Sequence, residues 1–569
     1  MDRNWKIKDQ GNPAIVEHLS QVLGVDKVLA TLLTQRNVSN YDEAKAFFRP
    51  DLSQLHDPFL MKDMDKAVKR VEDAIKNKEK ILIYGDYDVD GTTSVALLYT
   101  FLKKITPNIE YYVPNRYNEG YGVSFKGIEY AASSNFSLII SLDCGIKSVE
   151  KVELAKSKNI DFIICDHHFP GDKIPDAVAV LDPKRPDCSY PYKELSGCGV
   201  GFKLIQAYSL SNRLPFDELI PYLDLVAVSI ASDIVPVTGE NRILLHFGLK
   251  ILNESPRTGI KSIIKIAGIT TKEISVDDIV FRIGPRINAA GRIESGSKAV
   301  SLLTAETEDY AASMSDTINE FNTTRKNIDS IITNDALNVI AGDPALKDCY
   351  STVLFNPSWH KGVIGIVASR LIETYYRPTV ILTESNGYAT GSARSVDGFD
   401  LYQAIDECSD LLENFGGHMF AAGVTLKLEN IPLFKQRFEA VVSKYIRQDQ
   451  LIPTIEIDTE LTLKDITPKF FRILKQFQPF GPNNMSPVFL TRNVVDNGNG
   501  KIVGSTSEHL KLELIQEEAP FCCYPAIGFQ LSEHFDYIKK GNPFDICYSI
   551  EENEFRGNTT LQIRIRDIK

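Results

Sequence analysis

The chain has 569 residues and a mass of 63.7 kDa, with 63 Lys and Arg residues against 75 Asp and Glu residues. This length predicts three or four domains, and a content of 43% hydrophobic and 24% charged residues excludes disordered and collagen-like proteins. The net charge of −12 argues against a broad nucleic-acid-binding surface, but it leaves room for a local basic groove.

The sequence shows no sign of a membrane segment or a targeting segment. No apolar run approaches the ~18 residues of a membrane span, and the residues after Met1 lack the apolar core of a signal peptide. The nine cysteines are scattered and never spaced C-x-x-C, which argues against a disulfide framework and a structural zinc site. We therefore expect a cytoplasmic protein without a membrane partner.

The expected elements begin with a helical segment over residues 1–75. From Lys80 onward, short apolar strands alternate with helical stretches, which is typical of a parallel sheet covered on both faces. We assign this α/β domain to residues 76–305. Its expected strands are residues 80–84, 109–113, 137–142 and 160–165.

The rest of the chain divides into three further parts. A helical connector is expected over residues 306–340, and a second, smaller α/β domain over 341–450. After Pro453 the pattern changes to alternating strands broken by Gly and Asn clusters, which predicts a β-rich module of the size of a small barrel over 451–569. The fold class is therefore α/β with a C-terminal β-rich domain.

Three aspartates alternate directly after the first strand of the sheet. Asp86, Asp88 and Asp90 lie between a buried strand and a helix. Carboxylates so close together repel one another, so such a loop needs a cation, and oxygen ligands suit Mg²⁺ or Mn²⁺. Taken alone, a single pair of alternating aspartates is more typical of a solvated turn with an aspartate capping the helix.

The same arrangement recurs at three other element ends. Asp143 follows the third strand, Asp166, His167 and His168 follow the fourth, and Asp233 follows a helix over residues 223–230. Because side chains at the carboxyl ends of parallel strands meet at one edge of the sheet, these groups are expected to converge. Several carboxylates with one or two imidazoles predict a two-metal site that activates water and clamps the oxygens of a phosphoryl group.

The ordered set of motifs resembles the DHH phosphoesterase superfamily. The four superfamily motifs read GDYDVDGTTS at 85–94, LDCGI at 142–146, DHH at 166–168 and ASDIVPV at 231–237. Further motifs resemble the RecJ-type single-strand-specific 5′ to 3′ exonucleases. These are FRIGPRINAAGRI at 281–293, WHKGVIGIVASRLIE at 359–373, GSARSVDGFDLYQAI at 391–405, GGHMFAAG at 416–423 and PFGPNNMSPVF at 479–489.

The resemblance implies a DHH catalytic domain, a DHH-associated domain and an OB-fold-like domain, with two Mn²⁺ or Mg²⁺ ions. It places Asp143 as the bridge between the ions, His168 at the scissile phosphate and Asp166 beside it. At one position the superfamily often has histidine, whereas this chain has Tyr84. The metal ligands that it implies are Asp86, Asp88, Asp90, Asp143, His167 and Asp233.

A second set of residues is suited to phosphate. Ser392 and Arg394 offer a hydroxyl and a planar guanidinium, and the glycines around His418 let backbone N–H groups approach an anion. The resemblance places Ser392 and Arg394, with Arg116, in a pocket for the terminal 5′-phosphate; the neighbouring Asn115 stands where histidine is more common. The resemblance also implies that a narrow channel near the metals is lined by Arg282, Arg286, Asn288 and Arg292. Such a run is also typical of an interdomain surface. Trp359 is a candidate stacking surface.

These features together predict a metal-dependent exonuclease that releases 5′-mononucleotides from single-stranded DNA in recombination and repair. We expect a monomer that cooperates with a helicase and a single-strand-binding protein. ATP is not expected, because no G-x-x-x-x-G-K-[ST] motif is present. Two alternatives are a phosphodiesterase for oligonucleotides or cyclic dinucleotides, and a non-catalytic scaffold of a replication complex.

Overall fold

The computed structural model describes residues 3–270, 273–517, 519–555 and 558–569. The chain forms two compact units, one made of Met1–Asp51 with Ile452–Lys569 and the other of Leu52–Leu451. Among the described residues, no helix combines the length and the apolar character that crossing a membrane requires.

The larger unit is built on a five-stranded parallel sheet, as the alternating pattern predicted. The strand order is β3-β2-β4-β5-β6, so the chain starts near one edge and reaches the other. The order reverses next to β2, and ligand sites of open α/β sheets lie at the strand ends near such a point. The strands are β2 (Ile81–Gly85), β3 (Ile109–Tyr112), β4 (Leu138–Leu142), β5 (Asp161–Cys165) and β6 (Ala179–Leu181).

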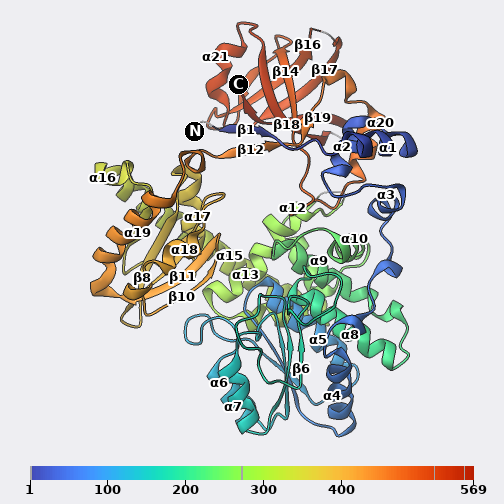
Figure 1. The fold of residues 1–569 in the computed structure, drawn as a ribbon, viewed down its shortest axis with the longest axis vertical. Coiled ribbons are helices and arrows are strands. Elements are labelled where there is room, and N and C mark those ends of the chain that lie inside the picture. The colour runs from blue at the N-terminus through green and yellow to red at the C-terminus, as the bar shows by residue number, and fades with distance from the viewer. Residues whose placement is uncertain (1–2, 271–272, 518, 556–557) are drawn as a thin grey trace. The chain divides into compact units, whose positions relative to one another are not determined.

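Helices cover both faces of this sheet (Figure 1). Ile81 and Ile83 pack into one apolar cluster, while Leu82 and Tyr84 pack into a second, because successive side chains of a strand point to opposite faces. The first cluster includes residues of α4 (Met64–Lys76), α5 (Val89–Lys103) and α8 (Gly197–Ser211). The second includes residues of α6 (Phe125–Ser133) and α7 (Val149–Ser157).

A helical layer follows the sheet and ends in the long expected connector. That connector is α15 (Glu308–Gly342), a single helix of 35 residues. It is helical even through the polar stretch 319–326. The preceding elements are α9 (Leu223–Ser232), α10 (Gly239–Glu254), α11 (Thr258–Ile266), α12 (Val276–Asp278), a π-helical turn η5 (Ile279–Ile283), α13 (Gly284–Ile293) and α14 (Gly296–Leu303).

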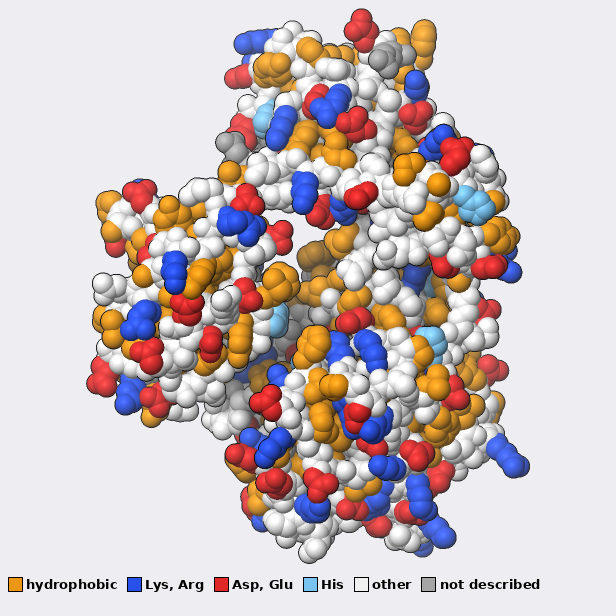
Figure 2. All heavy atoms as spheres, in the orientation of Figure 1, with side chains coloured by type: hydrophobic (Ala, Val, Ile, Leu, Met, Phe, Trp, Pro, Cys, Tyr) orange, Lys and Arg blue, Asp and Glu red, His pale blue; other side chains and the backbone are white. Residues whose placement is uncertain are grey.

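Charged side chains of both signs are interspersed on the face drawn in Figure 2. Lys and Arg alternate there with Asp and Glu, so this face offers no broad basic surface. This distribution agrees with the net charge of −12 and restricts any phosphate-binding path on this face to local clusters.

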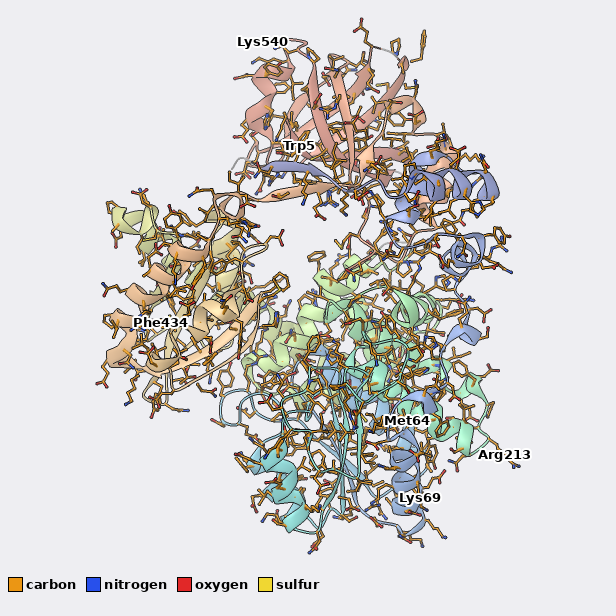
Figure 3. The ribbon with its side chains drawn as sticks, in the orientation of Figure 1. Trp5, Met64, Lys69, Arg213, Phe434 and Lys540 are labelled. Carbon is orange, nitrogen blue, oxygen red and sulfur yellow. The ribbon has the colours of Figure 1, made fainter. Side chains whose placement is uncertain are left out.

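The second domain of the larger unit is a smaller mixed sheet with the order β10-β11-β9-β8-β7, in which only β7 and β8 pair in parallel. Phe434, labelled in Figure 3, is fully buried and stacks on Phe438 at 5.7 Å between ring centroids. The elements are α16 (Pro344–Lys347), β7 (Thr352–Phe355), α17 (Ile364–Thr374), β8 (Thr379–Ser385), β9 (Tyr388–Arg394), α18 (Leu401–Asp406), β10 (Asn414–His418), β11 (Ala421–Lys427) and α19 (Ile431–Tyr445).

The smaller unit contains the predicted β-rich barrel. The pairings β14–β16, β16–β17, β17–β19, β19–β18 and β18–β14 close five strands on themselves, as in an OB-fold. Its elements are β13 (Thr459–Glu460), α20 (Pro468–Lys475), β14 (Phe489–Asp496), β15 (Lys501–Val503), β16 (His509–Gln516), β17 (Ala519–Gly528), α21 (Phe535–Ile538), β18 (Phe544–Phe555) and β19 (Asn558–Ile568).

The expectation of an entirely helical N-terminal segment is wrong at its start. Helices α1 (Pro13–Leu23), α2 (Lys27–Thr34) and α3 (Tyr41–Phe48) are present, but β1 (Asn4–Ile7) pairs in parallel with β12 (Thr454–Ile457). Trp5, on β1, donates from Nε1 to Asp567 Oδ2 at 2.7 Å (Figure 3). The partner strand lies far along the chain, so no local pattern reveals this pairing.

Candidate metal centre

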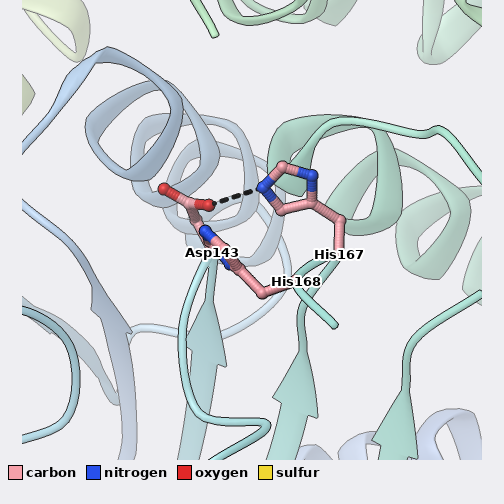
Figure 4. A group of neighbouring side chains, drawn as sticks. All are labelled: Asp143, His167 and His168. Atoms are coloured by element: carbon pink, nitrogen blue, oxygen red, sulfur yellow. Dashed lines mark hydrogen bonds and ion pairs between the residues drawn. The ribbon is translucent and has the colours of Figure 1, made fainter. Parts of the chain in front are cut away.

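The carboxyl ends of β2, β4 and β5 and the end of α9 bring their acidic and imidazole groups together. His167 Nε2 lies 3.1 Å from Asp143 Oδ1 (Figure 4). The same nitrogen lies 3.6 Å from Asp90 Oδ2 and 3.7 Å from Asp233 Oδ2. Residues from three other elements therefore surround the His167 imidazole, in line with the convergence expected from the sequence.

Two overlapping groups of side chains have the spacing of metal ligands. One consists of Asp143, His167 and His168, and the other of Asp90, His167 and Asp233. Within each group the ligand atoms lie within 4.8 Å of one another. His167 belongs to both groups, and because one ring nitrogen binds a single cation, two neighbouring cations here would have to share a carboxylate instead.

Several polar atoms of this cluster are buried without a hydrogen-bond partner among the described residues. They are Asp86 Oδ2, Asp143 Oδ2 and His167 Nδ1. Burial, followed by the neighbouring carboxylates, raises the pKa of Asp143 well above its usual range, and burial together with Asp90 and Asp88 does the same to the pKa of Asp233. Divalent cations would offset this repulsion and supply the missing partners, so the donor set fits Mn²⁺ or Mg²⁺.

The structure gives the three alternating aspartates different surroundings. Asp88 caps α5, where its Oδ1 accepts a hydrogen bond from Gly91 N at 2.9 Å. The expectation of an aspartate that caps the helix is therefore confirmed for Asp88, which also lies in the acidic cluster. Asp86 Oδ1 accepts from Gly122 N at 3.1 Å. Asp90 accepts from the first two N–H groups of α8, Gly197 and Cys198, at 2.6 and 2.8 Å.

Burial and the charge of Asp88 raise the pKa of Asp90 to about 6, although the hydrogen bonds from the N–H groups of Gly197 and Cys198 act to lower it. The glycine at the start of α8 is required by space, because a Cβ at Gly197 would lie 2.7 Å from the Cβ of Asp143. The run of glycines at 197–201 is therefore a tightly packed helix N-terminus, and its first turn holds Asp90.

Asp166, like Asp90, has protein donors at both of its oxygens, but one of these donors is the ring of His168. Oδ1 accepts from the His168 ring at 2.8 Å, and Oδ2 accepts from Ile146 N at 2.9 Å. Burial alone would raise the pKa of Asp166, but the hydrogen bond and charge of His168 hold it well below its usual range. In return, Asp166 raises the pKa of His168 to about 9 against the effect of burial. Asp166 therefore orients His168 and keeps it protonated.

Two tyrosines near the cluster take roles that the sequence did not show. Tyr84 is fully buried, and its hydroxyl bonds to Gly122 O at 3.1 Å and is bonded by Ser124 N, so it supports the loop. Tyr121 was not predicted: its hydroxyl lies 3.2 Å from His168 Nε2 and 3.3 Å from Asp143 O. Its position between two glycines at 120 and 122 was the only local signal of an exposed turn.

A cationic cluster lies in the same unit. Burial, followed by the charges of Arg116, Arg325 and Arg394, lowers the pKa of Arg292 to about 9. Arg116 Nε is buried without a partner among the described residues, and the Arg394 guanidinium bonds Ser392 Oγ at 2.9 Å. These contacts unite the predicted residues Arg116, Arg292, Ser392 and Arg394 in one cluster. Among the described residues, no carboxylate forms a close ion pair with its arginines, although the charge of Asp88 acts to raise the pKa of Arg292.

The remaining predicted residues are arranged less uniformly. Arg282 bonds to Asp278 at 3.2 Å and to Gly268 O at 2.9 Å, which directs its guanidinium to a neighbouring turn. Arg286 bonds Asn319 Oδ1 on α15 at 3.1 Å, and Asn288 Oδ1 is buried without a partner among the described residues. His418 lies at the end of β10, where its residue is exposed to solvent but its ring is partly covered. This partial burial, followed by the charges of Arg394 and His168, lowers the pKa of His418.

One expectation in this region is wrong. Trp359 is buried, and its Nε1 donates to Asp335 Oδ2 at 2.7 Å, so it belongs to the core beside α15 and offers no stacking surface.

Comparison with known families follows the same division of the chain. Residues 80–230 match the DHH family, N-terminal domain, residues 347–444 match the DHHA1 domain, and residues 457–567 match the RecJ OB domain. The fold and the site thus define a DHH-family protein with an associated DHHA1 domain and an OB domain.

Full-length relatives narrow the class. The chain is 36% identical to the single-stranded-DNA-specific exonuclease RecJ of Bacillus subtilis over 99% of this chain and 70% of that protein. It is 32% identical to the RecJ of Escherichia coli over 89% of this chain and 90% of the relative. A crystal structure of RecJ from Thermus thermophilus in complex with Mn²⁺ superposes with a TM-score of 0.85 at 25% identity, covering all of this chain and 79% of that one. The chain belongs to the RecJ family of single-stranded-DNA-specific exonucleases.

Proposed function

We propose that this protein is a metal-dependent exonuclease that hydrolyses single-stranded DNA from the 5′ end and releases 5′-mononucleotides. The observation that carries the proposal is the pairing of a buried carboxylate–imidazole cluster with a buried arginine cluster in one unit. The first suits divalent cations, and the second suits a terminal phosphate. The names of the full-length relatives support the same activity.

The metal ligands are proposed from the atoms that lack protein partners and from the two ligand groups. Asp86, Asp90, Asp143, His167 and Asp233 would hold two Mn²⁺ or Mg²⁺ ions. Asp88, whose charge raises the pKa of Asp90 and of Asp233, would complete the set. When bound, such ions lower the pKa of a coordinated water and stabilise the charge that develops on the phosphoryl oxygens. Asp143, with one oxygen facing His167 and the other unpartnered among the described residues, is the proposed bridge.

His168 is the proposed group at the scissile phosphate. With a pKa of about 9 its ring is protonated at neutral pH, so it can donate a hydrogen bond to a phosphoryl oxygen. Asp166 fixes Nδ1 of that ring and leaves Nε2 facing the Tyr121 hydroxyl. A phosphoryl oxygen of the substrate would replace the Tyr121 hydroxyl as the acceptor for His168 Nε2, or would accept from the same N–H group together with that hydroxyl.

The arginine cluster is the proposed pocket for the terminal 5′-phosphate. Arg116, Arg292 and Arg394 offer guanidinium donors, and burial followed by the charge of Arg116 lowers the pKa of the nearby Lys361. A Cβ at Gly365 would lie 2.9 Å from both Arg394 Nη2 and Ser392 Oγ, so this glycine keeps the first turn of α17 clear of both groups. An anion there would satisfy several buried donors at once. A pocket that holds a chain end favours an exonuclease over an internal nuclease.

The OB barrel is the proposed track for the single strand beyond the active site. Lys501, Lys511, Ile527 and Arg564 are paired in register across β15, β16, β17 and β19. The two lysines and the arginine are exposed and form a basic row, in which Arg564 also pairs with Glu551 at 3.2 Å. Phe529 is half exposed and lies 5.5 Å from the Arg564 guanidinium and 5.1 Å from the His509 ring. Exposed aromatic and basic groups suit base stacking and phosphate contact. By contrast, Phe477 is fully buried.

We further propose that the protein acts as a cytoplasmic monomer without ATP, on strands that a helicase opens and a single-strand-binding protein covers, during recombination and repair. The basic row makes a phosphodiesterase for oligonucleotides or cyclic dinucleotides the less favoured alternative, because a dinucleotide needs no extended track. The unpartnered carboxylate oxygens among the described residues argue against a scaffold that has lost its metals.

The deciding experiment compares end labels and strandedness. Single strands and duplexes labelled at the 5′ or the 3′ end are incubated with Mn²⁺ or Mg²⁺. We expect labelled mononucleotides at the earliest times only from 5′-labelled single strands. Early release of the 3′ label would contradict the polarity, and cleavage confined to short oligonucleotides would favour the phosphodiesterase.

A further inference from the structure

The OB barrel carries a second surface whose charge is opposite to that of the basic row. It is a groove of about 800 Å³, lined only by residues of the smaller unit. β16 connects the two surfaces: Lys511 lies near its start, and Ile515 and Gln516 lie at its end in the groove. The two surfaces are therefore separate parts of one small domain.

The floor of the groove is apolar. Leu461 and Leu490 are buried beneath it, Val495 and Ile515 are half-buried in it, and Pro520 and Pro543 extend it on the exposed side. A volume of this size holds a few side chains, in the range of pockets that bind small molecules and peptide anchors.

The rim of the groove is acidic. Glu460, Asp465 and Glu517 line it together with a single cation, Arg492. The Arg492 guanidinium is held by Glu460 at 2.9 Å and by Asp545 at 3.0 Å, so two carboxylates already neutralise it. A phosphodiester backbone would meet net negative charge here, whereas a Lys or Arg side chain would be attracted.

Local hydrogen bonds hold the groove in shape. The register of β14 against β18 shifts between Thr491 and Val494, and this bulge directs Arg492 into the groove. Gln516 spans the groove wall, since its Oε1 accepts from Leu463 N at 2.8 Å and its Nε2 donates to Arg492 O at 2.9 Å. The surface is thus preformed, which reduces the entropic cost of binding.

We propose that this groove docks a peptide segment of a partner protein in which Lys or Arg side chains alternate with large apolar ones. The apolar side chains pack on Val495 and Ile515, and the cations pair with Glu460 and Glu517. The OB domain then has two ligands of opposite charge, a nucleic acid on the basic row and a basic peptide in the groove.

The test uses the full-length protein and a short fluorescent peptide that alternates Lys with Leu and Phe. A second peptide has Glu in place of each Lys. Binding is followed by fluorescence anisotropy, with an oligo-dT of similar length as competitor. We expect the basic peptide to bind, the acidic peptide not to bind, and oligo-dT not to displace the peptide.

Matched variants separate the groove from general attraction to an acidic protein. Glu460→Gln with Glu517→Gln should raise the dissociation constant of the basic peptide about tenfold. Glu508→Gln with Glu533→Gln, which removes the same charge elsewhere on the domain, should leave it within about twofold. Both variants should keep the exonuclease rate of the wild type. Equal losses in the two variants, or displacement of the peptide by oligo-dT, would overturn the proposal while leaving the exonuclease assignment untouched.

Discussion

Asp143 and His167 meet through one carboxylate oxygen and one ring nitrogen, 3.1 Å apart, while the second oxygen of Asp143 is buried without a partner among the described residues. A buried polar atom without a partner costs free energy, and a buried carboxylate costs more. The unpartnered oxygen is therefore the clearest structural sign of a cation site.

The first prediction concerns the support of His168. Asp166→Asn removes the charge that keeps His168 protonated, so the turnover rate should fall about 10- to 100-fold. Single-turnover release of mononucleotides measures it. Because Asp166 is not a proposed metal ligand, the number of Mn²⁺ ions bound per chain should stay unchanged. Asp172→Asn, at an exposed position in the following loop, is the control and should match the wild type. A loss of bound metal in Asp166→Asn would contradict the orienting role.

The second prediction concerns the pH dependence of the metal-free protein. The pKa of Asp90 is about 6 in the folded state, and the pKa values of Asp143 and Asp233 are also raised. An unfolded aspartate loses its proton near pH ~3.9, so between about pH 4 and 6 these three aspartates bind more protons in the folded state than in the unfolded state. His167, whose pKa burial lowers to about 3, acts in the opposite direction but is a single group against three. The free energy of unfolding should therefore fall as the pH rises through this window.

Thermal melts in a chelator from about pH 4.5 to about pH 8 test this dependence, and they are repeated with Mn²⁺. The metal should stabilise the protein most at the upper end of the range, because cations compete with protons for the same oxygens. Asp143→Asn should flatten the dependence in the chelator. A melting temperature that rises with pH over the whole window without metal would contradict the account.

The third prediction concerns the phosphate pocket. Arg394→Lys keeps the charge but loses the fork of donors, so KM for 5′-phosphorylated single strands should rise about tenfold. KM for strands with a 5′-hydroxyl should change little, because they do not use the pocket. The exposed Arg437, which pairs with Asp410, supplies the control Arg437→Lys. An equal rise for both kinds of end would show that Arg394 does not read the phosphate.

The fourth prediction concerns a buried ion pair outside the site. Lys203 and Glu240 are both buried, with Nζ 3.1 Å from Oε1, and Tyr190 also donates to Glu240. Lys203→Met leaves the carboxylate without its cation, so the free energy of unfolding should fall by about 3–5 kcal/mol. Denaturant titration measures it. Lys69→Met is the control: this side chain is 76% exposed on α4 (Figure 3), and the change should cost less than about 0.5 kcal/mol. A loss below about 1 kcal/mol in Lys203→Met would contradict the predicted role of the pair.

The sequence predicted the elements and the site better than it predicted individual roles. The strands β2, β4 and β5 are short and apolar, so their ends can be located in the sequence. Because they run parallel, the aspartates that follow them lie at one edge of the sheet. Asp90 and Asp166 look alike in sequence, yet one binds the start of α8 and the other holds His168. Only the hydrogen-bond donors around each carboxylate distinguish them, and these come from distant segments.

The other two differences have separate causes. Tyr121 approaches His168 across 47 positions of the chain. Arg282 stands in an arginine-rich motif but pairs with Asp278, four residues earlier on the same helical segment. The contact of Tyr121 is tertiary and is not encoded by residue type and spacing, whereas the pair of Arg282 with Asp278 is a local contact whose i,i+4 spacing is present in the sequence.

The most direct test of the central claim is the rate of mononucleotide release from a 5′-phosphorylated single strand by the wild type and by Asp143→Asn, each titrated with Mn²⁺. The account predicts metal-dependent release by the wild type, none by the variant at any Mn²⁺ concentration, and the same circular dichroism spectrum for both proteins. Release by Asp143→Asn at a rate close to that of the wild type would contradict it.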